Sequence, residues 1–147
     1  MVNTFLPYEN FSESARCLDK ARLGKQRVEC HQILGVLLEW PTKDGKPRKG
    51  WTNHPAVRMW RGHASKLMVY MNSMVNEWLA RGCNNSYALW TDEQVAAIAA
   101  TENGNVPWLG DERVHASHRA ALLFKEPKWY SAFGWKEPAV RDYYWPA

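Results

Sequence analysis

The sequence predicts an all-α protein that folds as one compact, single-domain helical bundle over residues 1–147. Two observations lead to this prediction. Signals that start and stop helices divide the chain into segments with helical periodicity, and no segment alternates apolar and polar residues as a half-buried strand would. A length of 147 residues fits one domain, and 46% apolar residues are enough to fill its core.

Residues that favour helix ends delimit the helical segments. Asp19 can cap a long helix, which must end before Trp40-Pro41 because the residue before a proline disfavours helical backbone. Thr91 and Gln94 have the spacing of a capping box, and Pro127 stops the last helix. We therefore expect helices over residues 10–18, 20–39, 53–81 (with a break near Gly62 and an end at Gly82), 91–100 and 111–125.

Charge and aromatic content favour an anionic partner. The net charge is +4, the isoelectric point is near 9.0, and residues 41–53 are predicted to form an exposed basic loop. The nine tryptophans can fill a core, but their flat faces also stack on unpaired bases. Together these features suggest a nucleic acid.

Other features exclude several classes of protein. Cys17, Cys30 and Cys83 are an odd number at wide spacings, which fits neither a disulfide framework nor a zinc site, so we expect small, partly buried thiols. No apolar run approaches the roughly 20 residues that span a bilayer, and the first residues lack the profile of a secretory signal. We therefore expect a cytoplasmic protein without a membrane partner.

The helix expected over residues 20–39 carries an apolar and a polar stripe. At about 100° per residue, the stripe expected to face the core comprises Leu23, Cys30, Leu34 and Leu37. The neighbouring stripe comprises Arg22, Lys25, Gln26 and Glu29. Either this second face is merely solvated, with an ordinary Lys25–Glu29 ion pair, or its cations hold phosphates. In the second case Glu29 accepts and donates protons as a general acid or base, or stabilises a developing cation.

Two histidines in the last helix are further candidates. His115 and His118 are three residues apart and share one helix face, which suits a metal pair, a contact to phosphate or base, or simple surface exposure. No third ligand of matching character lies nearby, so we expect no metal and no cofactor.

Near the helix that starts at Pro55, His54 is typical of a capping or packing residue. Trp129 and its neighbour Tyr130 suit the core, although Lys125 and Lys128 beside them leave a contact to DNA open.

Six short motifs occur in order along nearly the whole chain. They are Asn-Thr-Phe-Leu-Pro-Tyr (3–8), Arg-Leu-Gly-Lys-Gln-Arg-Val-Glu (22–29), Asn-His-Pro-Ala-Val-Arg-Met-Trp (53–60), Glu-Trp-Leu-Ala-Arg-Gly (77–82), His-Ala-Ser-His-Arg (115–119), and Trp-Tyr (129–130) followed by Phe-Gly (133–134). With them the chain resembles the pyrimidine-dimer DNA glycosylase/AP lyase family, whose best-known member is bacteriophage endonuclease V. The resemblance is to a bacterial and phage branch of that family.

The resemblance implies a compact all-α bundle of the endonuclease V type and a mechanism that uses the chain's own start. In the family the α-amino group attacks the sugar carbon that bears the damaged base, expels the base and leaves an imine to the DNA. A glutamate on the first long helix assists, and β-elimination then nicks the strand. An α-amine has a pKa of about 8, so a useful fraction is neutral near pH 7.

Carried over to this chain, the resemblance implies that Glu29 is the catalytic carboxylate and that Met1 or Val2 supplies the amine. Val28 stands where the family commonly has a basic residue directly before the glutamate. The residues then expected to contact DNA are Asn3, Arg22, Lys25, Gln26, Arg27, His54, Arg58, His115, His118, Arg119, Lys125 and Trp129.

We therefore expect a monomeric DNA glycosylase with AP lyase activity on damaged or modified pyrimidines in double-stranded DNA, associated with the nucleoid when bound. Two alternatives stay open. The first is a non-catalytic DNA-binding protein of the same fold. The second is a metal-dependent nuclease that uses His115 and His118.

Overall fold

The structure, a computed structural model, describes residues 3–41, 45 and 53–146. Within these residues the chain forms seven α-helices, one 3-10 helix and no strand, which confirms the all-α prediction. The elements are α1 (Phe11–Cys17), α2 (Lys20–Leu37), α3 (Pro55–Trp60), α4 (Ala64–Ala80), α5 (Asp92–Ala99), α6 (Glu112–Lys125), α7 (Pro127–Tyr130) and the 3-10 helix η1 (Ser131–Phe133). None of these helices is long and apolar enough to cross a membrane.

The predicted ends of the helices agree with the structure to within two residues, because local sequence determines them. The side chain of Asn10 caps α1 by accepting a hydrogen bond from the Glu13 N–H at 2.9 Å. Thr91 and Gln94 form the predicted capping box of α5. The predicted break near Gly62 separates α3 from α4, and this glycine has a φ of +82°.

The side-chain cap and the last residue of α2 differ from the prediction. Asp19 stands at the N-cap position, but its carboxylate does not cap the helix. It accepts hydrogen bonds from the Tyr130 hydroxyl and from Arg22 instead, so the expected side-chain cap is wrong. The helix ends at Leu37, two residues early, since Glu39 adopts a left-handed φ of +58° that helical backbone excludes.

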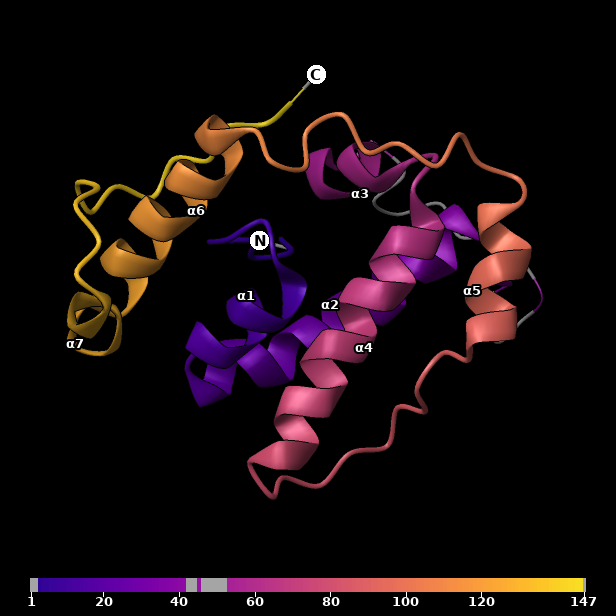
Figure 1. Ribbon diagram of the computed structural model, residues 1–147, viewed down its shortest axis with the longest axis horizontal. Helices are drawn as coiled ribbons and strands as arrows, with labels where there is room; N and C mark the ends of the chain where they lie inside the picture. Colours follow the sequence, from indigo (N-terminus) through magenta and orange to yellow (C-terminus); the bar gives the residue numbers. More distant parts are fainter. Residues whose placement is uncertain (1–2, 42–44, 46–52, 147) are drawn as a thin grey trace.

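Helix α4 is the centre of the packing. It packs most extensively against α2 and also against α1 and α5. Helices α6 and α7 lie on the other side of the amino-terminal segment, which runs between α6 and the group formed by α1 and α2 (Figure 1). Residues 3–7 are thereby enclosed by helices from both halves of the sequence.

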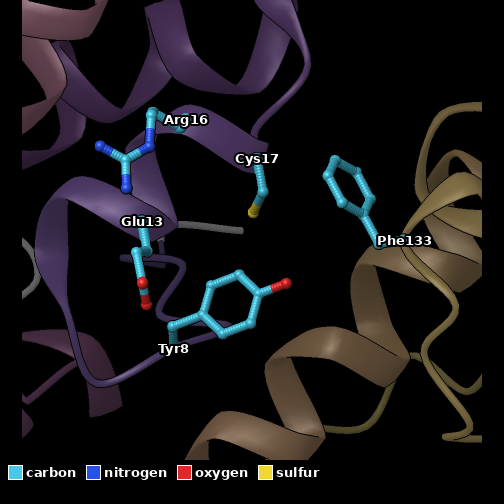
Figure 2. A pocket seen from close by; sticks show the side chains of 5 residues that line it. All are labelled: Tyr8, Glu13, Arg16, Cys17 and Phe133. Atoms are coloured by element: carbon cyan, nitrogen blue, oxygen red, sulfur yellow. The ribbon is translucent and has the colours of Figure 1, made fainter.

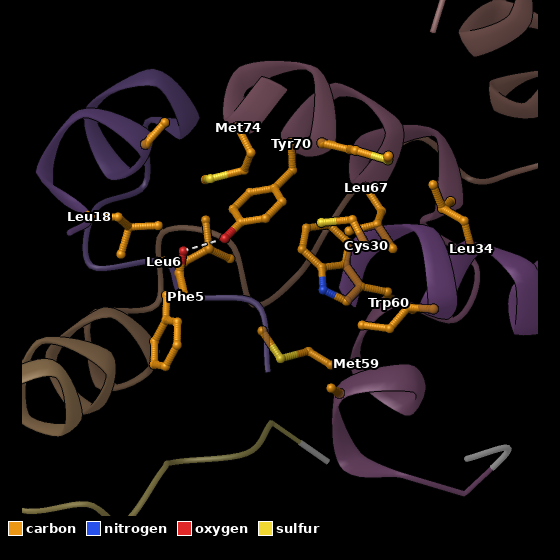
Figure 3. Packing of buried hydrophobic residues seen from close by; sticks show 14 of the residues in the cluster. Phe5, Leu6, Leu18, Cys30, Leu34, Met59, Trp60, Leu67, Tyr70 and Met74 are labelled. Carbon is orange, nitrogen blue, oxygen red and sulfur yellow. Dashed lines mark hydrogen bonds between the residues drawn. The ribbon is translucent and has the colours of Figure 1, made fainter. Parts of the chain in front are cut away.

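The largest core aromatics use their polar atoms to hold this amino-terminal segment. Trp60 and Tyr70 are fully buried. The indole N–H of Trp60 donates to the Thr4 hydroxyl at 2.8 Å. The Tyr70 hydroxyl donates to the Phe5 carbonyl at 2.6 Å (Figure 3). Buried aromatics of this kind need a partner for their N–H or O–H group, and here the start of the chain provides it.

Candidate active site

Residues 3–8 form an extended segment inside a helical protein. Residues 3–7 are buried, and none of them belongs to a helix. Because the described part of the chain has no sheet, the backbone N–H and C=O groups of this segment cannot find partners in a ladder. Side chains from α2, α4 and α6 provide those partners, and these contacts position residues 3–7.

Gln26 of α2 is the main clamp on this segment. Its Oε1 accepts the Phe5 N–H at 2.9 Å and lies 2.7 Å from the Tyr70 hydroxyl. Its Nε2 donates to the Asn3 carbonyl at 3.1 Å and to Oε2 of Glu29 at 3.2 Å. Gln26 is only 1% exposed, so it cannot serve as the DNA contact that we expected from its place on the polar stripe. It positions the segment instead.

Two histidines of α6 hold the next residue of the segment. The Leu6 N–H donates to Nδ1 of His118 at 2.9 Å, and Nδ1 of His115 lies 2.8 Å from the Leu6 carbonyl. Nε2 of His115 accepts the Gly110 N–H at 3.0 Å. These bonds assign the proton of His115 to Nδ1 and leave Nδ1 of His118 unprotonated, so the two rings have opposite tautomers. Burial lowers the pKa of His118 to about 3, which keeps that ring neutral.

The burial of the same two histidines corrects their expected contact to DNA. His115 and His118 are 2% and 0% exposed, so they offer no surface to DNA, and we no longer regard them as DNA contacts. In the described part of the chain, no three His, Cys, Asp or Glu side chains are grouped closely enough to hold a metal ion. The two histidines act as structural supports of the amino-terminal segment.

Glu29 lies where the segment begins. Its Oε2 accepts the Asn3 N–H at 3.3 Å, in addition to the bond from Gln26. The carboxylate is partly buried, and this burial raises its pKa, whereas the Asn3 N–H and the charge of Lys25 lower it. Burial has the largest effect, so the pKa of Glu29 lies above its ordinary value. A carboxyl group with a raised pKa is suited to accept and return a proton near neutral pH.

The cations of α2 have different surroundings. Lys25 is exposed and its charge acts on Glu29, while Arg22 pairs with Asp19 at 3.2 Å. Arg27 points to α4, where its guanidinium lies 4.3 Å from the ring centroid of Trp78 and donates to Asn85 at 2.7 Å. Arg27 therefore does not join the group around Glu29.

The remaining predicted DNA contacts divide into structural and exposed residues. His54 caps α3 by accepting the Ala56 N–H at 3.1 Å, the capping role that we considered for it. Arg119 donates to the Pro7 carbonyl at 2.7 Å and pairs with Glu112 and Glu137, so it is another support of the amino-terminal segment. The exposed members of the set are Arg58, Lys125 and Trp129.

Arg58 lines a hollow of about 430 Å³ with Pro55, Arg61 and the tail residues Trp145 and Pro146. Two arginines beside a tryptophan are suited to contact a phosphate and a base.

The aromatic pair after α6 divides between core and surface. Tyr130 is fully buried and bonds to Asp19, which agrees with a core position. Trp129 is 44% exposed, and its indole N–H donates to the Cys17 carbonyl at 2.7 Å. Trp129 thus has a free ring surface that DNA could reach.

A second hollow, of about 370 Å³, lies between α1 and η1 (Figure 2). The rings of Tyr8 and Phe133 flank it, with the sulfur of Cys17 between them (Figure 2). Burial raises the pKa of the Cys17 thiol to about 12, so this thiol is a poor nucleophile. Like Cys30 and Cys83 it is a free thiol, as predicted.

Sequence reasoning missed Tyr143 as a residue of this site. Its ring centroid lies 6.2 Å from that of Phe5 and 5.7 Å from that of His118. Burial raises the pKa of Tyr143, a hydrogen bond with the Asn3 side chain lowers it, and the charge of Glu29 raises it. The aromatic tail was visible in the sequence, but no local pattern relates it to the start of the chain.

Met1 and Val2, the two candidates for the amine, lie outside the described residues. The described part of the site therefore comprises the buried segment that starts at Asn3 and, at Asn3, a carboxylate with a raised pKa.

Comparison with known protein families assigns this chain to a family. A family model described as pyrimidine dimer DNA glycosylase matches residues 2–91, which is more than half of the chain. The chain belongs to the pyrimidine dimer DNA glycosylase family, and the family name implies DNA glycosylase activity on DNA that contains pyrimidine dimers. The match includes Glu29 and the amino-terminal segment, whereas α6 and the tail lie beyond it. Comparisons with curated proteins and with solved structures found no match.

Proposed function

We propose that this protein is a DNA glycosylase with associated AP lyase activity, which uses an α-amine at the start of the chain and the carboxylate of Glu29. The substrate is a damaged or modified pyrimidine in double-stranded DNA. The observation that supports this proposal is the hydrogen bond from the Asn3 N–H to Oε2 of Glu29 at 3.3 Å, because Asn3 directly follows Met1 and Val2 in the chain.

Chain connectivity favours Val2 over Met1 as the source of the amine. One residue spans at most about 3.6 Å of chain, so the nitrogen of Val2 lies within that distance of the Asn3 nitrogen. The nitrogen of Met1 has up to about twice that reach. We propose that removal of Met1 leaves the α-amine of Val2 as the nucleophile, with Glu29 as the base that accepts its proton.

The proposed reaction begins when the neutral amine attacks C1′ of the deoxyribose. The bond from C1′ to the base breaks and its electron pair leaves with the base. Glu29 accepts the proton that the attacking nitrogen loses, and returns it to O4′ when the sugar ring opens. The product is a protonated imine between the chain and C1′. Loss of a proton from C2′ and departure of the 3′ phosphate then nick the strand.

The basic residues near Glu29 are proposed to hold the DNA. Lys25 is exposed on the same face, and Arg22 lies one helical turn before it. Contacts from such cations to phosphates fix the duplex without reading its sequence. They release counterions, so binding should weaken steeply as salt increases.

Borohydride trapping tests the proposal directly. Wild-type protein and the Glu29→Gln variant are incubated with a duplex that contains a pyrimidine dimer and with one that contains an abasic site. We expect a covalent adduct with wild type and none with the variant, while both bind DNA with similar affinity. Salt-dependent binding without any adduct would instead support a non-catalytic DNA-binding protein.

A further inference from the structure

Two consecutive residues of α7 hold the link between α1 and α2. The indole N–H of Trp129 donates to the Cys17 carbonyl at 2.7 Å. The Tyr130 hydroxyl accepts the Asp19 N–H at 3.0 Å and donates to Oδ1 of the Asp19 carboxylate. Asp19 and Tyr130 are 111 residues apart in the sequence, so the carboxyl-terminal half of the chain fixes the place where α2 begins.

Packing fixes the position of Tyr130 itself. The residue is fully buried, and its ring stacks on that of Trp135 with 5.6 Å between the centroids. The indole N–H of Trp135 in turn donates to the Tyr8 hydroxyl at 2.9 Å. Burial and the bond to Asp19 raise the pKa of Tyr130, so its hydroxyl keeps its proton and remains a donor to the carboxylate. Oδ1 of Asp19 therefore has a fixed partner.

The other oxygen of this carboxylate, Oδ2, holds Arg22. Nη1 of Arg22 donates to it at 3.2 Å, and within the described residues the guanidinium makes no other hydrogen bond. The side chains of Arg22 and Asp19 are 23% and 12% exposed. A guanidinium has five N–H donors in a planar fork, so most of the Arg22 donors have no partner in the described part of the chain.

Asp19 makes these bonds in place of an ordinary helix cap. An aspartate at the N-cap position usually accepts an N–H group of the first helical turn, but α2 has no side-chain cap. Arg22 lies three residues before Lys25 and seven before Glu29, so the three residues share one face of α2. The Asp19 carboxylate thus orients a cation on the face that carries Glu29.

We propose that Asp19, held by Tyr130, is a positioning residue that orients the Arg22 guanidinium toward a phosphate of bound DNA. The inference rests on the part of the proposed function in which Arg22 holds the DNA. An arginine can bind a carboxylate with one part of its fork and a phosphate with another. A side chain that is already ordered loses less conformational entropy on binding than a free one. Asp19 therefore strengthens the contact to DNA, although its own charge repels phosphate.

The substitution Asp19→Asn separates positioning from the effect of charge. Asparagine keeps an oxygen for the Tyr130 hydroxyl but has no negative charge to hold Arg22. Loss of a negative charge beside a DNA-binding face would by itself tighten binding. Positioning predicts the opposite. In fluorescence anisotropy, we expect the variant to bind a duplex with a reduced, uncleavable abasic site about tenfold more weakly than wild type. At saturating DNA, borohydride trapping on a normal abasic duplex should keep the wild-type rate, because the phosphate contact forms before the reaction.

Two sets of variants control this comparison. Glu77→Gln removes a carboxylate from the Glu77–Arg81 ion pair, whose side chains are 21% and 22% exposed, and should bind DNA no more weakly than wild type. Arg22→Met should weaken binding at least as much as Asp19→Asn. The double variant should bind like Arg22→Met alone, since Asp19 acts only through Arg22.

Unchanged or tighter binding by Asp19→Asn, or additive effects in the double variant, would overturn the inference alone. Thermal melting shows whether Asp19→Asn is folded. If it is not, Tyr130→Phe, which removes only the hydroxyl, decides: weaker binding supports the inference, and wild-type affinity overturns it. Wild-type protein that binds the duplex but forms no borohydride adduct would overturn the proposed glycosylase and lyase activity, whereas the affinities alone decide the role of Asp19.

Discussion

Replacing Gln26 by leucine tests the claim that α2 clamps the start of the chain. The substitution keeps the size of the side chain but removes the partners of the Phe5 N–H and the Asn3 carbonyl, both of which are buried. Each buried polar group left unpaired costs about 1–3 kcal/mol. Burial of the leucine side chain offsets part of this loss. We therefore expect the free energy of unfolding to fall by about 2–4 kcal/mol.

The Gln26→Leu protein that remains folded should also react with DNA more slowly than wild type. A displacement of about 1 Å at the reacting groups can cost on the order of a hundredfold in rate. Urea unfolding gives the stability, and the rate of borohydride trapping at saturating DNA gives the activity of the folded fraction. Gln32→Leu, on the same helix, is the control and should change both little. If Gln26→Leu unfolds and is trapped like wild type, the clamp has no role and the reasoning is refuted.

Two further predictions concern pH and salt. The pKa of His118 falls from an ordinary value of about 6.5 to about 3 in the folded protein, so its contribution to stability is complete above pH 6.5 and is lost as pH decreases toward 3. We expect the free energy of unfolding of the wild type, measured in urea, to fall by about 2 kcal/mol between pH 7 and pH 5. The fall should be smaller in His118→Asn, which keeps an acceptor for the Leu6 N–H. An unchanged pH dependence in this variant would contradict a buried, neutral His118. Lys25→Met should weaken DNA binding and reduce the slope of log affinity against log salt by about 1, measured by fluorescence anisotropy, and an unchanged slope would mean that Lys25 does not contact a phosphate.

Local sequence was sufficient to predict α1 to α6, but not α7 and η1, nor the side-chain partners of the polar residues. The capping box at Thr91 and the break at Gly62 depend on neighbouring residues, and both are present. The carboxylate of Asp19 was expected to cap α2 for the same kind of reason, yet it bonds to Tyr130, which lies 111 residues away. A cap predicted from sequence assumes that no distant partner competes for the carboxylate.

The candidate site shows the same limit more strongly. Helical spacing grouped Gln26 with Glu29, but it could not tell that one is 1% exposed and the other partly open. The difference arises from the amino-terminal segment, which covers Gln26. The spacing of His115 and His118 suits two side chains that bind one metal ion as well as two that hydrogen-bond to a backbone segment. Their actual partner, Leu6, lies 109 and 112 residues away in the sequence.

The position of the covalent bond to DNA tests the central claim most directly. Wild-type protein is trapped with borohydride on an abasic duplex, digested with a protease and analysed by mass spectrometry. We predict that Met1 is absent and that the deoxyribose remnant is attached to the α-amine of Val2. An adduct on a lysine side chain, or no adduct at all, would contradict the account in which Glu29 acts on the start of the chain.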